Sequence, residues 1–343
     1  MGEIDSSLLE RGQSSLPDRN LGMELVRATE AAAIQASAWI GRGDKDSADG
    51  AAVTAMRDFL NTVDFEGTVI IGEGEKDDAP MLANGEIVGN GNGPKYDIAV
   101  DPVDGTSVTA EGRAHAISVI AVSDRGTMYN PKDVFYMNKL ITTIAGKGVV
   151  SLDLSPAENV RELAKALNKD VSEITVAIID RPRHREIVDQ VRLAGARTRL
   201  FLDGDVAAGV HAVTGSGGID MLLGIGGAPE GTISACATKA LGGYMQGRLS
   251  PLSPEEMKNA ILAGHNLEKI FEIDDLVASD NTYFVATGVT DGLLLNGVYR
   301  KGDLIRTESM ILRSHSGTIR RVSADHIASR WKNKRSPYDL NGF

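Results

Sequence analysis

The sequence predicts an α/β fold with two lobes, a mixed sheet in the first and parallel βαβ units in the second. Apolar residues with helical spacing open the chain, and short β-branched runs that end in glycine and acidic residues follow them. Farther along, three strands alternate with three helices, which favours a parallel sheet. The 343 residues are enough for two lobes with buried cores.

The composition along the chain suggests where the lobes begin and end. A polar, acidic N-terminal stretch reaches Pro17, and the basic run RWKNKR lies near the C-terminus. We therefore expect a flexible arm, an N-terminal α/β lobe, a C-terminal α/β lobe and a tail. Their expected ranges are 1–19, 20–160, 161–330 and 331–343.

In the first half, the helices are predicted from apolar spacing and the strands from β-branched runs. Apolar residues recur every three or four positions from Leu21 to Ile40, and Gly41 and Gly43 end this helix. A second helix is expected over about 48–63. The strands that follow are the run GTVIIG, residues 97–101 and residues 116–123.

The second half alternates regularly between the two kinds of element. Strands are expected over 174–180, 197–202 and 219–225, and the helices that follow them over 184–194, 205–213 and 230–241. The last third returns to strands, in the segments TYFVATGV, LIRTESMIL and GTIRRVS.

Composition excludes several classes of protein. The net charge of −11 argues against nucleic acid as a partner, because phosphate backbones need basic surfaces. No stretch approaches the ~20 apolar residues of a membrane span, and the N-terminus lacks the order of a signal peptide, so we expect a cytoplasmic protein. The single cysteine, Cys236, excludes an internal disulfide and is expected to be a small buried residue.

The segment VDPVDGTS carries the first chemical signal, because two carboxylates end a buried strand. Asp101 and Asp104 would repel each other unless a cation lies between them. Gly105, Thr106 and Ser107 then begin a helix, where free backbone N–H groups suit a phosphate. The alternative is that Asp104 or Thr106 only caps that helix.

Further acidic residues lie at strand ends or helix starts and suit a hard divalent cation, which takes oxygen ligands. In GIGGAPEG, Pro229 occupies the third glycine position of a dinucleotide fingerprint, so this loop is not a nucleotide site. The acidic residues are Asp49, Glu73, Glu75, Asp77, Asp101, Asp104 and Glu230.

Two other strand ends carry groups that could hold a ligand. Arg181 and Arg183 in RPRH are of the type that binds phosphate in a bidentate way. In DGDVAAG, Asp203 or Asp205 could bind hydroxyl groups, and capping and ligand binding remain equal alternatives for Asp205. His184 is expected to be a cap or a surface group, and no histidine spacing predicts a zinc site.

Taken together, these segments resemble class II fructose-1,6-bisphosphatase, within the metal-dependent, lithium-sensitive sugar and inositol phosphatases. The similarity runs from about Asp18 to about His326. Eight blocks occur in the family's order: GRGDKDSADGAAVTAMR, IGEGEKDDAPML, DPVDGT, FYMNKL, DRPRH, DGDVAAG, GIGGAPEG and ATGVTDG.

The resemblance implies a layered α-β-α-β-α fold, an N-terminal metal-binding lobe and a C-terminal substrate lobe. It implies metal ligands at Asp49, Glu73, Asp101, Asp104 and Glu230. The implied sugar-phosphate contacts are Asp104, Gly105, Thr106, Tyr136, Arg181, Pro182, Arg183, Asp203, Gly204, Asp205 and Gly227. Lys45, Asp77 and Thr106 match positions needed for activity.

The activity implied is hydrolysis of the 1-phosphate of fructose 1,6-bisphosphate with Mg²⁺ or Mn²⁺, in a homo-oligomer. Thr106 would orient or help deprotonate the attacking water. Sedoheptulose bisphosphate or an inositol phosphate is the alternative substrate, and a non-catalytic metal and sugar-phosphate binding module is the alternative of another class. Two positions depart from the family: many members have glutamate in place of Asp104, and Ala83 replaces a tyrosine.

Overall fold

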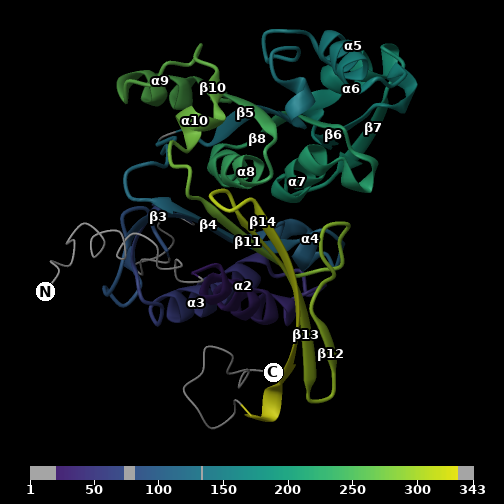
Figure 1. Ribbon diagram of the computed structural model, residues 1–343. Coiled ribbons are helices and arrows are strands. Elements are labelled where there is room, and N and C mark those ends of the chain that lie inside the picture. Colours follow the sequence, from purple (N-terminus) through teal and green to yellow (C-terminus); the bar gives the residue numbers. More distant parts are fainter. Residues whose placement is uncertain (1–20, 73–81, 133, 331–343) are drawn as a thin grey trace, which may run out of the picture.

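The computed structural model describes residues 21–72, 82–132 and 134–330, which form two mixed sheets with helices packed on their faces (Figure 1). Glu73, Glu75 and Asp77 lie outside these residues, as do the expected arm up to residue 19 and the expected tail.

The first sheet has eight strands among the described residues, in the order β12-β13-β11-β4-β3-β1-β2, with β14 beside β13. Only β1 and β3 are parallel in it, so the mixed sheet predicted for the N-terminal lobe is confirmed. Its strands are β1 (Glu66–Ile71), β2 (Ile87–Val88), β3 (Lys95–Asp104), β4 (Ile117–Asp124), β11 (Tyr283–Gly288), β12 (Tyr299–Lys301), β13 (Leu304–Arg313) and β14 (Thr318–Ile327).

The second sheet has the order β10-β9-β5-β8-β6-β7. The predicted parallel units are present, since β6 is parallel to both β7 and β8. The sheet is nevertheless mixed, because β5 lies antiparallel between β8 and β9. Its strands are β5 (Tyr136–Thr142), β6 (Thr175–Ile179), β7 (Arg197–Phe201), β8 (Met221–Gly227), β9 (Tyr244–Leu249) and β10 (Phe271–Glu272).

The two sheets do not follow the order of the chain. The strands β11 to β14 belong to the first sheet because β11 pairs antiparallel with β4, and β5 belongs to the second sheet. A division of the chain near residue 160 therefore does not separate the sheets.

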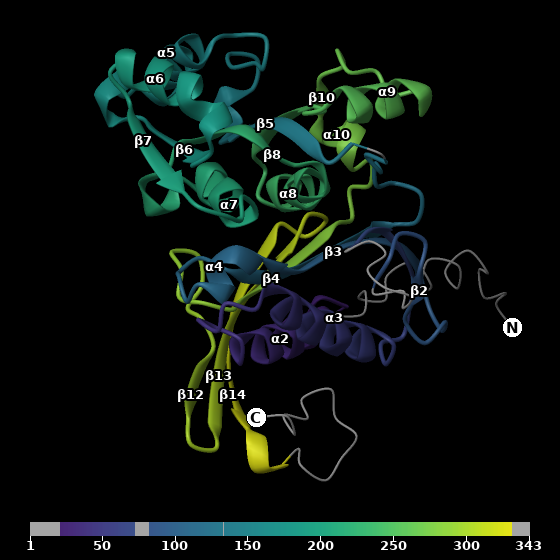
Figure 2. The same ribbon diagram turned by 180° about the vertical axis from the view of Figure 1, so that it is seen from behind.

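Helices form three layers, one on each outer face and one between the two sheets (Figures 1 and 2). α2 and α3 pack on the first sheet, α7 and α8 lie between the two sheets, and α5 and α6 pack on the outer face of the second sheet. The helix bounds are α2 (Leu21–Ser37), α3 (Lys45–Leu60), α4 (Thr106–Ala110), α5 (Pro156–Leu167), α6 (Arg185–Leu193), α7 (Val206–Thr214), α8 (Ala228–Ala240), α9 (Pro254–Leu262) and α10 (Ile273–Leu276).

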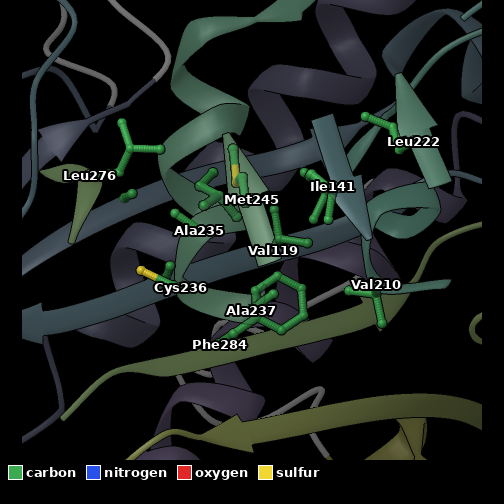
Figure 3. Packing of buried hydrophobic residues seen from close by; sticks show 14 of the residues in the cluster. Val119, Ile141, Val210, Leu222, Ala235, Cys236, Ala237, Met245, Leu276 and Phe284 are labelled. Carbon is green, nitrogen blue, oxygen red and sulfur yellow. The ribbon is translucent and has the colours of Figure 1, made fainter. Parts of the chain in front are cut away.

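The core between the sheets joins residues that are distant in the sequence (Figure 3). Val119 and Phe284 from the first sheet pack with Cys236 of α8, while Ile141 and Met245 come from the second sheet. Cys236 is fully buried, and burial raises the pKa of its thiol to about 12. The prediction that Cys236 is a small buried residue is confirmed. Among the described residues, no helix is both long enough and apolar enough to cross a membrane.

Helix boundaries follow local capping. The second helix begins three residues earlier than the expected range, because the Asp44 carboxylate accepts hydrogen bonds from the backbone N–H (3.0 Å) and the hydroxyl (2.6 Å) of Ser47. The helix α5 was not predicted, although Ser155 and Glu158 form a complete capping box at its start.

Candidate functional site

The candidate site is built around the end of β3, where the sequence places two aspartates. An irregularity in the pairing of β3 with β4 falls between Asp101 and Asp104. Gly105 follows with φ at 105°, a left-handed conformation that favours glycine, and Thr106 is the first residue of α4. Gly105 caps α4 without any side-chain hydrogen bond, so the interpretation of Asp104 as the cap of this helix is wrong.

Asp104 is buried among other acidic side chains. It is 4% exposed, and its Oδ2 atom has no hydrogen-bond partner among the described residues. Burial raises its pKa well above the usual range, and the neighbouring charges of Asp205, Glu230 and Asp203 raise it further. A Cβ atom on Gly204 would lie 3.1 Å from Asp104 Oδ1, so the loop after β7 passes closely over this carboxylate.

Glu230 reaches the same region from the first turn of α8, which follows β8 directly. Pro229 occupies the first turn of α8, where its missing N–H costs nothing, and Glu230 follows it. A Cβ atom on Gly227 would overlap the Glu230 carboxylate, so a larger residue there would displace this side chain. Burial raises the pKa of Glu230, and Glu230 lines a cavity of about 320 Å³ together with Asp101.

Asp205 was expected either to cap a helix or to bind a ligand, and its side chain makes no capping hydrogen bond to α7. Instead it forms a short ion pair with Lys139, whose side chain is fully buried. The Lys139 ammonium also donates to the Gly227 carbonyl at 2.9 Å. This lysine therefore ties the loop after β7 to the junction of β8 and α8.

Sequence reasoning missed Lys139, although this lysine lies in the family segment FYMNKL. Met137, Lys139 and Ile141 alternate along β5, so they point to the same side of the strand, and all three are buried. A lysine on the apolar side of a strand is the signal that could have identified a buried cation.

The arginines after β6 lie beside the same loops. Arg181 Nη2 approaches Asp203 Oδ1 at 3.5 Å, and the other Asp203 oxygen accepts from the backbone N–H of Ser107 at 3.3 Å. The Arg183 guanidinium lies over the Tyr136 ring, 5.2 Å from its centroid. The structure thus brings Arg181, Arg183, Tyr136 and Asp203 together at the ends of the strands of the second sheet. Pro182 begins the 3₁₀ turn after Arg181.

His184 is neither a surface group nor a side-chain cap. Its Nε2 atom accepts from the backbone N–H of Ile225 at 2.8 Å, so the proton is on Nδ1, which donates to the Ile179 carbonyl at 2.7 Å. The side chain is 1% exposed. His184 therefore fixes the 3₁₀ turn that carries the arginines against β8.

The start of α3 contacts the start of α4. Lys45 Nζ donates to the Ser107 hydroxyl at 2.8 Å. Asp49 lies one helical turn after Lys45 and is buried, on a helix that packs against β3 and α4. Thr106 is half-buried next to Gly105.

The donor chemistry of this region fits a hard divalent cation. Asp104, Asp205 and Glu230 each have a buried carboxylate oxygen without a hydrogen-bond partner in the described part of the chain. Carboxylate oxygens are the ligands that Mg²⁺ and similar ions prefer. The described residues do not themselves bring three acidic, histidine or cysteine side chains into a complete metal site, and Glu73 and Asp77 lie outside them.

Comparison with known proteins gives one family and close relatives in enteric bacteria. Residues 19–326 match the family described as "Bacterial fructose-1,6-bisphosphatase, glpX-encoded". The chain is 44% identical over 325 residues to "Fructose-1,6-bisphosphatase 1 class 2" of Escherichia coli K12, covering 91% of this chain and 96% of the relative. The same figures hold for "Fructose-1,6-bisphosphatase class 2" of Escherichia coli O6:H1 and of Shigella flexneri.

Proposed function

The chain belongs to the class II, glpX-type fructose-1,6-bisphosphatases, which are phosphoric monoester hydrolases of gluconeogenesis, and we propose that the site around Asp104 carries out this reaction. The substrate is a sugar bisphosphate. The family uses a divalent metal, and we propose Mg²⁺ or Mn²⁺.

The observation that carries the proposal is an excess of buried negative charge. Asp104, Asp205 and Glu230 lie within each other's electrostatic influence, and Lys139 is the cation that lowers the pKa of Asp104 and of Glu230. Buried charges are costly unless they are paired. One ammonium group cannot balance the charge of three carboxylates, and a bound divalent cation would supply the missing positive charge.

We propose that Asp49, Glu73, Asp101, Asp104 and Glu230 hold the metal. When bound, a divalent ion of this kind lowers the pKa of water and neutralises charge on the transferring phosphoryl group. Asp101 and Glu230 line one cavity, which supports their pairing at this site. The side chain of Asp104 is shorter than that of glutamate, and the backbone at Gly204 passes close to its carboxylate.

The other residues of the site would bind and orient the substrate. Thr106, beside the left-handed Gly105, would orient or help deprotonate the attacking water, and the backbone N–H groups at this turn would face the reacting phosphate. Lys45 holds Ser107 of the same turn, and Asp77 would supply a further acid. Arg181 and Arg183 would hold the distal phosphate, beside the sugar-binding positions Tyr136, Pro182, Asp203, Gly204, Asp205 and Gly227.

We also propose the layered α-β-α-β-α arrangement of the sugar phosphatases, a cytoplasmic location and a homo-oligomer. The packing of α2 and α3, then a sheet, then α7 and α8, a second sheet, and α5 and α6 supports the layering. Light scattering after size-exclusion chromatography would give the oligomeric state.

The test is phosphate release from a panel of esters with Mg²⁺ or Mn²⁺ present and after chelation. We expect release from fructose 1,6-bisphosphate to stop on chelation and to return when the metal is restored. Sedoheptulose 1,7-bisphosphate and an inositol monophosphate complete the panel and define the specificity. Full turnover after exhaustive chelation would contradict the metal site.

A further inference from the structure

A second cavity, of about 220 Å³, lies behind the loop that carries Asp203 and Gly204. It opens to solvent and is bordered by the segment before β4, the segment after β11, the end of β7 and one side of α7, which lies next to α4 in both views (Figures 1 and 2). Its walls are mainly apolar, and the apolar side chains include Val108, Ile117, Phe201, Ile219, Leu294 and Leu295.

Basic side chains surround this apolar cavity. Arg113, His115, Arg199 and His211 line it, whereas Asp203 is the one acidic residue among the described lining residues. Arg113 forms an ion pair with Glu111 at 2.7 Å, and burial lowers the pKa of both His115 and His211, so Arg199 supplies the positive charge of this group. The Arg199 guanidinium donates to the carbonyl oxygen of Gly217 at 2.8 Å, which is a neutral partner.

Among these residues, His211 gives the most direct indication of a bound ligand. Its side chain is 4% exposed, and Nε2 has no hydrogen-bond partner among the described residues, while Nδ1 is bonded to the Ser216 hydroxyl at 2.8 Å. Burial, followed by the charges of Arg199, His115 and Arg321, lowers the pKa of His211 to about 4. A buried polar atom without a partner is costly, and a bound ligand would supply the missing contact.

The size of the cavity limits the ligand. A dry apolar cavity of roughly 150 Å³ is known to hold benzene, so a space of about 220 Å³ accommodates a single ring with one small substituent. The apolar walls suit the ring, and the Arg199 guanidinium suits a negatively charged substituent.

We infer that this cavity is a binding site for a small organic anion, with an apolar body of about one ring and a single carboxylate or phosphoryl group beside His211 and Arg199. It is separate from the carboxylate-rich site, although Asp203 and Gly204 border both. A bound ligand would therefore contact the back of the proposed substrate loop.

The test uses fluorine NMR of three probes that differ only in the substituent: 4-fluorobenzoate, 4-fluorophenylphosphonate and the neutral 4-fluorobenzamide. We expect at least one of the two anions to bind the full-length protein about tenfold more tightly than the amide, the gain typical of one charged hydrogen bond. Which anion binds better identifies the charged group. No binding of either anion, or equal binding of the amide, would overturn the inference.

Variants locate the bound probe. Ala207→Phe fills the cavity and should abolish binding, and Arg199→Met, at a half-exposed position, should weaken it about tenfold. Arg183→Met is the matched control, because it removes a guanidinium from the other site and should leave binding unchanged. Binding that survives in both cavity variants, or that is lost only in the control, would show that the probe occupies another place. None of these measurements requires turnover, so the outcome is independent of the proposed function.

Discussion

At the scale of single residues, the buried ion pair between Lys139 and Asp205 and the left-handed turn at Gly105 perform different tasks. The ion pair joins β5 to the loop after β7 without contacting solvent, since Lys139 is fully buried and Asp205 nearly so. The turn presents Thr106 toward the site without any side-chain cap. Substitutions at these positions should therefore separate positioning from chemistry.

Replacement of Thr106 tests the chemical role of its hydroxyl. We expect Thr106→Ala to lower kcat by about a hundredfold or more with little change in KM, as for a lost general acid–base group. Thr106→Ser should retain substantial activity, because it keeps the hydroxyl. If the side chain only stabilised α4, alanine would cost ~1 kcal/mol of stability and leave kcat nearly normal. Steady-state kinetics at saturating metal distinguish these results.

Replacement of Lys139 tests positioning. Lys139→Met keeps the length of the side chain but leaves Asp205 buried without its partner, so we expect a loss of about 3–5 kcal/mol in unfolding free energy and a higher KM. Adding Asp205→Asn should restore stability but not KM. The matched control is Lys169→Met, which removes the partner of buried Asp220 elsewhere in the second sheet. If the control raised KM equally, the effect would not be specific to the site.

At the scale of elements, α2 packs on the first sheet mainly through apolar residues, and one acidic residue, Glu30, is buried in the same contact. Glu30 is 4% exposed and accepts from the Thr307 hydroxyl of β13 at 3.2 Å, and His326 of β14 lies 4.0 Å away. Burial raises the pKa of Glu30 to about 7 from its ordinary 4.5. We therefore expect the stabilisation that α2 gains from packing on the sheet to depend on pH.

Because the folded protein keeps a proton on Glu30 that the unfolded chain releases above pH 4.5, its contribution to stability falls as pH rises toward 7. The loss amounts to roughly 3 kcal/mol across that window. We expect urea unfolding of the wild type to show this decline relative to Glu30→Gln, which cannot ionise. Parallel stability curves for the two proteins between pH 5 and pH 8 would contradict the prediction.

At the scale of the whole molecule, the site forms where loops from both sheets meet. The family resemblance implied that Asp104, Asp205 and Glu230 belong to one site, and in the structure the charges of Asp205 and Glu230 help to raise the pKa of the buried Asp104. The sequence did not predict that β11 to β14 join the first sheet, because the pairing of β4 with β11 links residues about 160 positions apart and periodicity is local. Lys139 was missed because a lysine in a strand is ordinarily exposed, and only its packed neighbours show that it is buried.

The central claim is that the buried carboxylates are retained for a cation and not for the fold. Thermal unfolding of Glu230→Gln with and without Mn²⁺ tests it most directly, with Glu30→Gln as a control for a buried acid outside the site. The account predicts that metal-free Glu230→Gln unfolds at or above the wild-type temperature, because charge repulsion is relieved, while the stabilisation by Mn²⁺ is largely lost. The control should keep the full response to Mn²⁺. A metal-free Glu230→Gln protein that unfolds at a much lower temperature, yet is stabilised by Mn²⁺ as strongly as the wild type, would contradict the account.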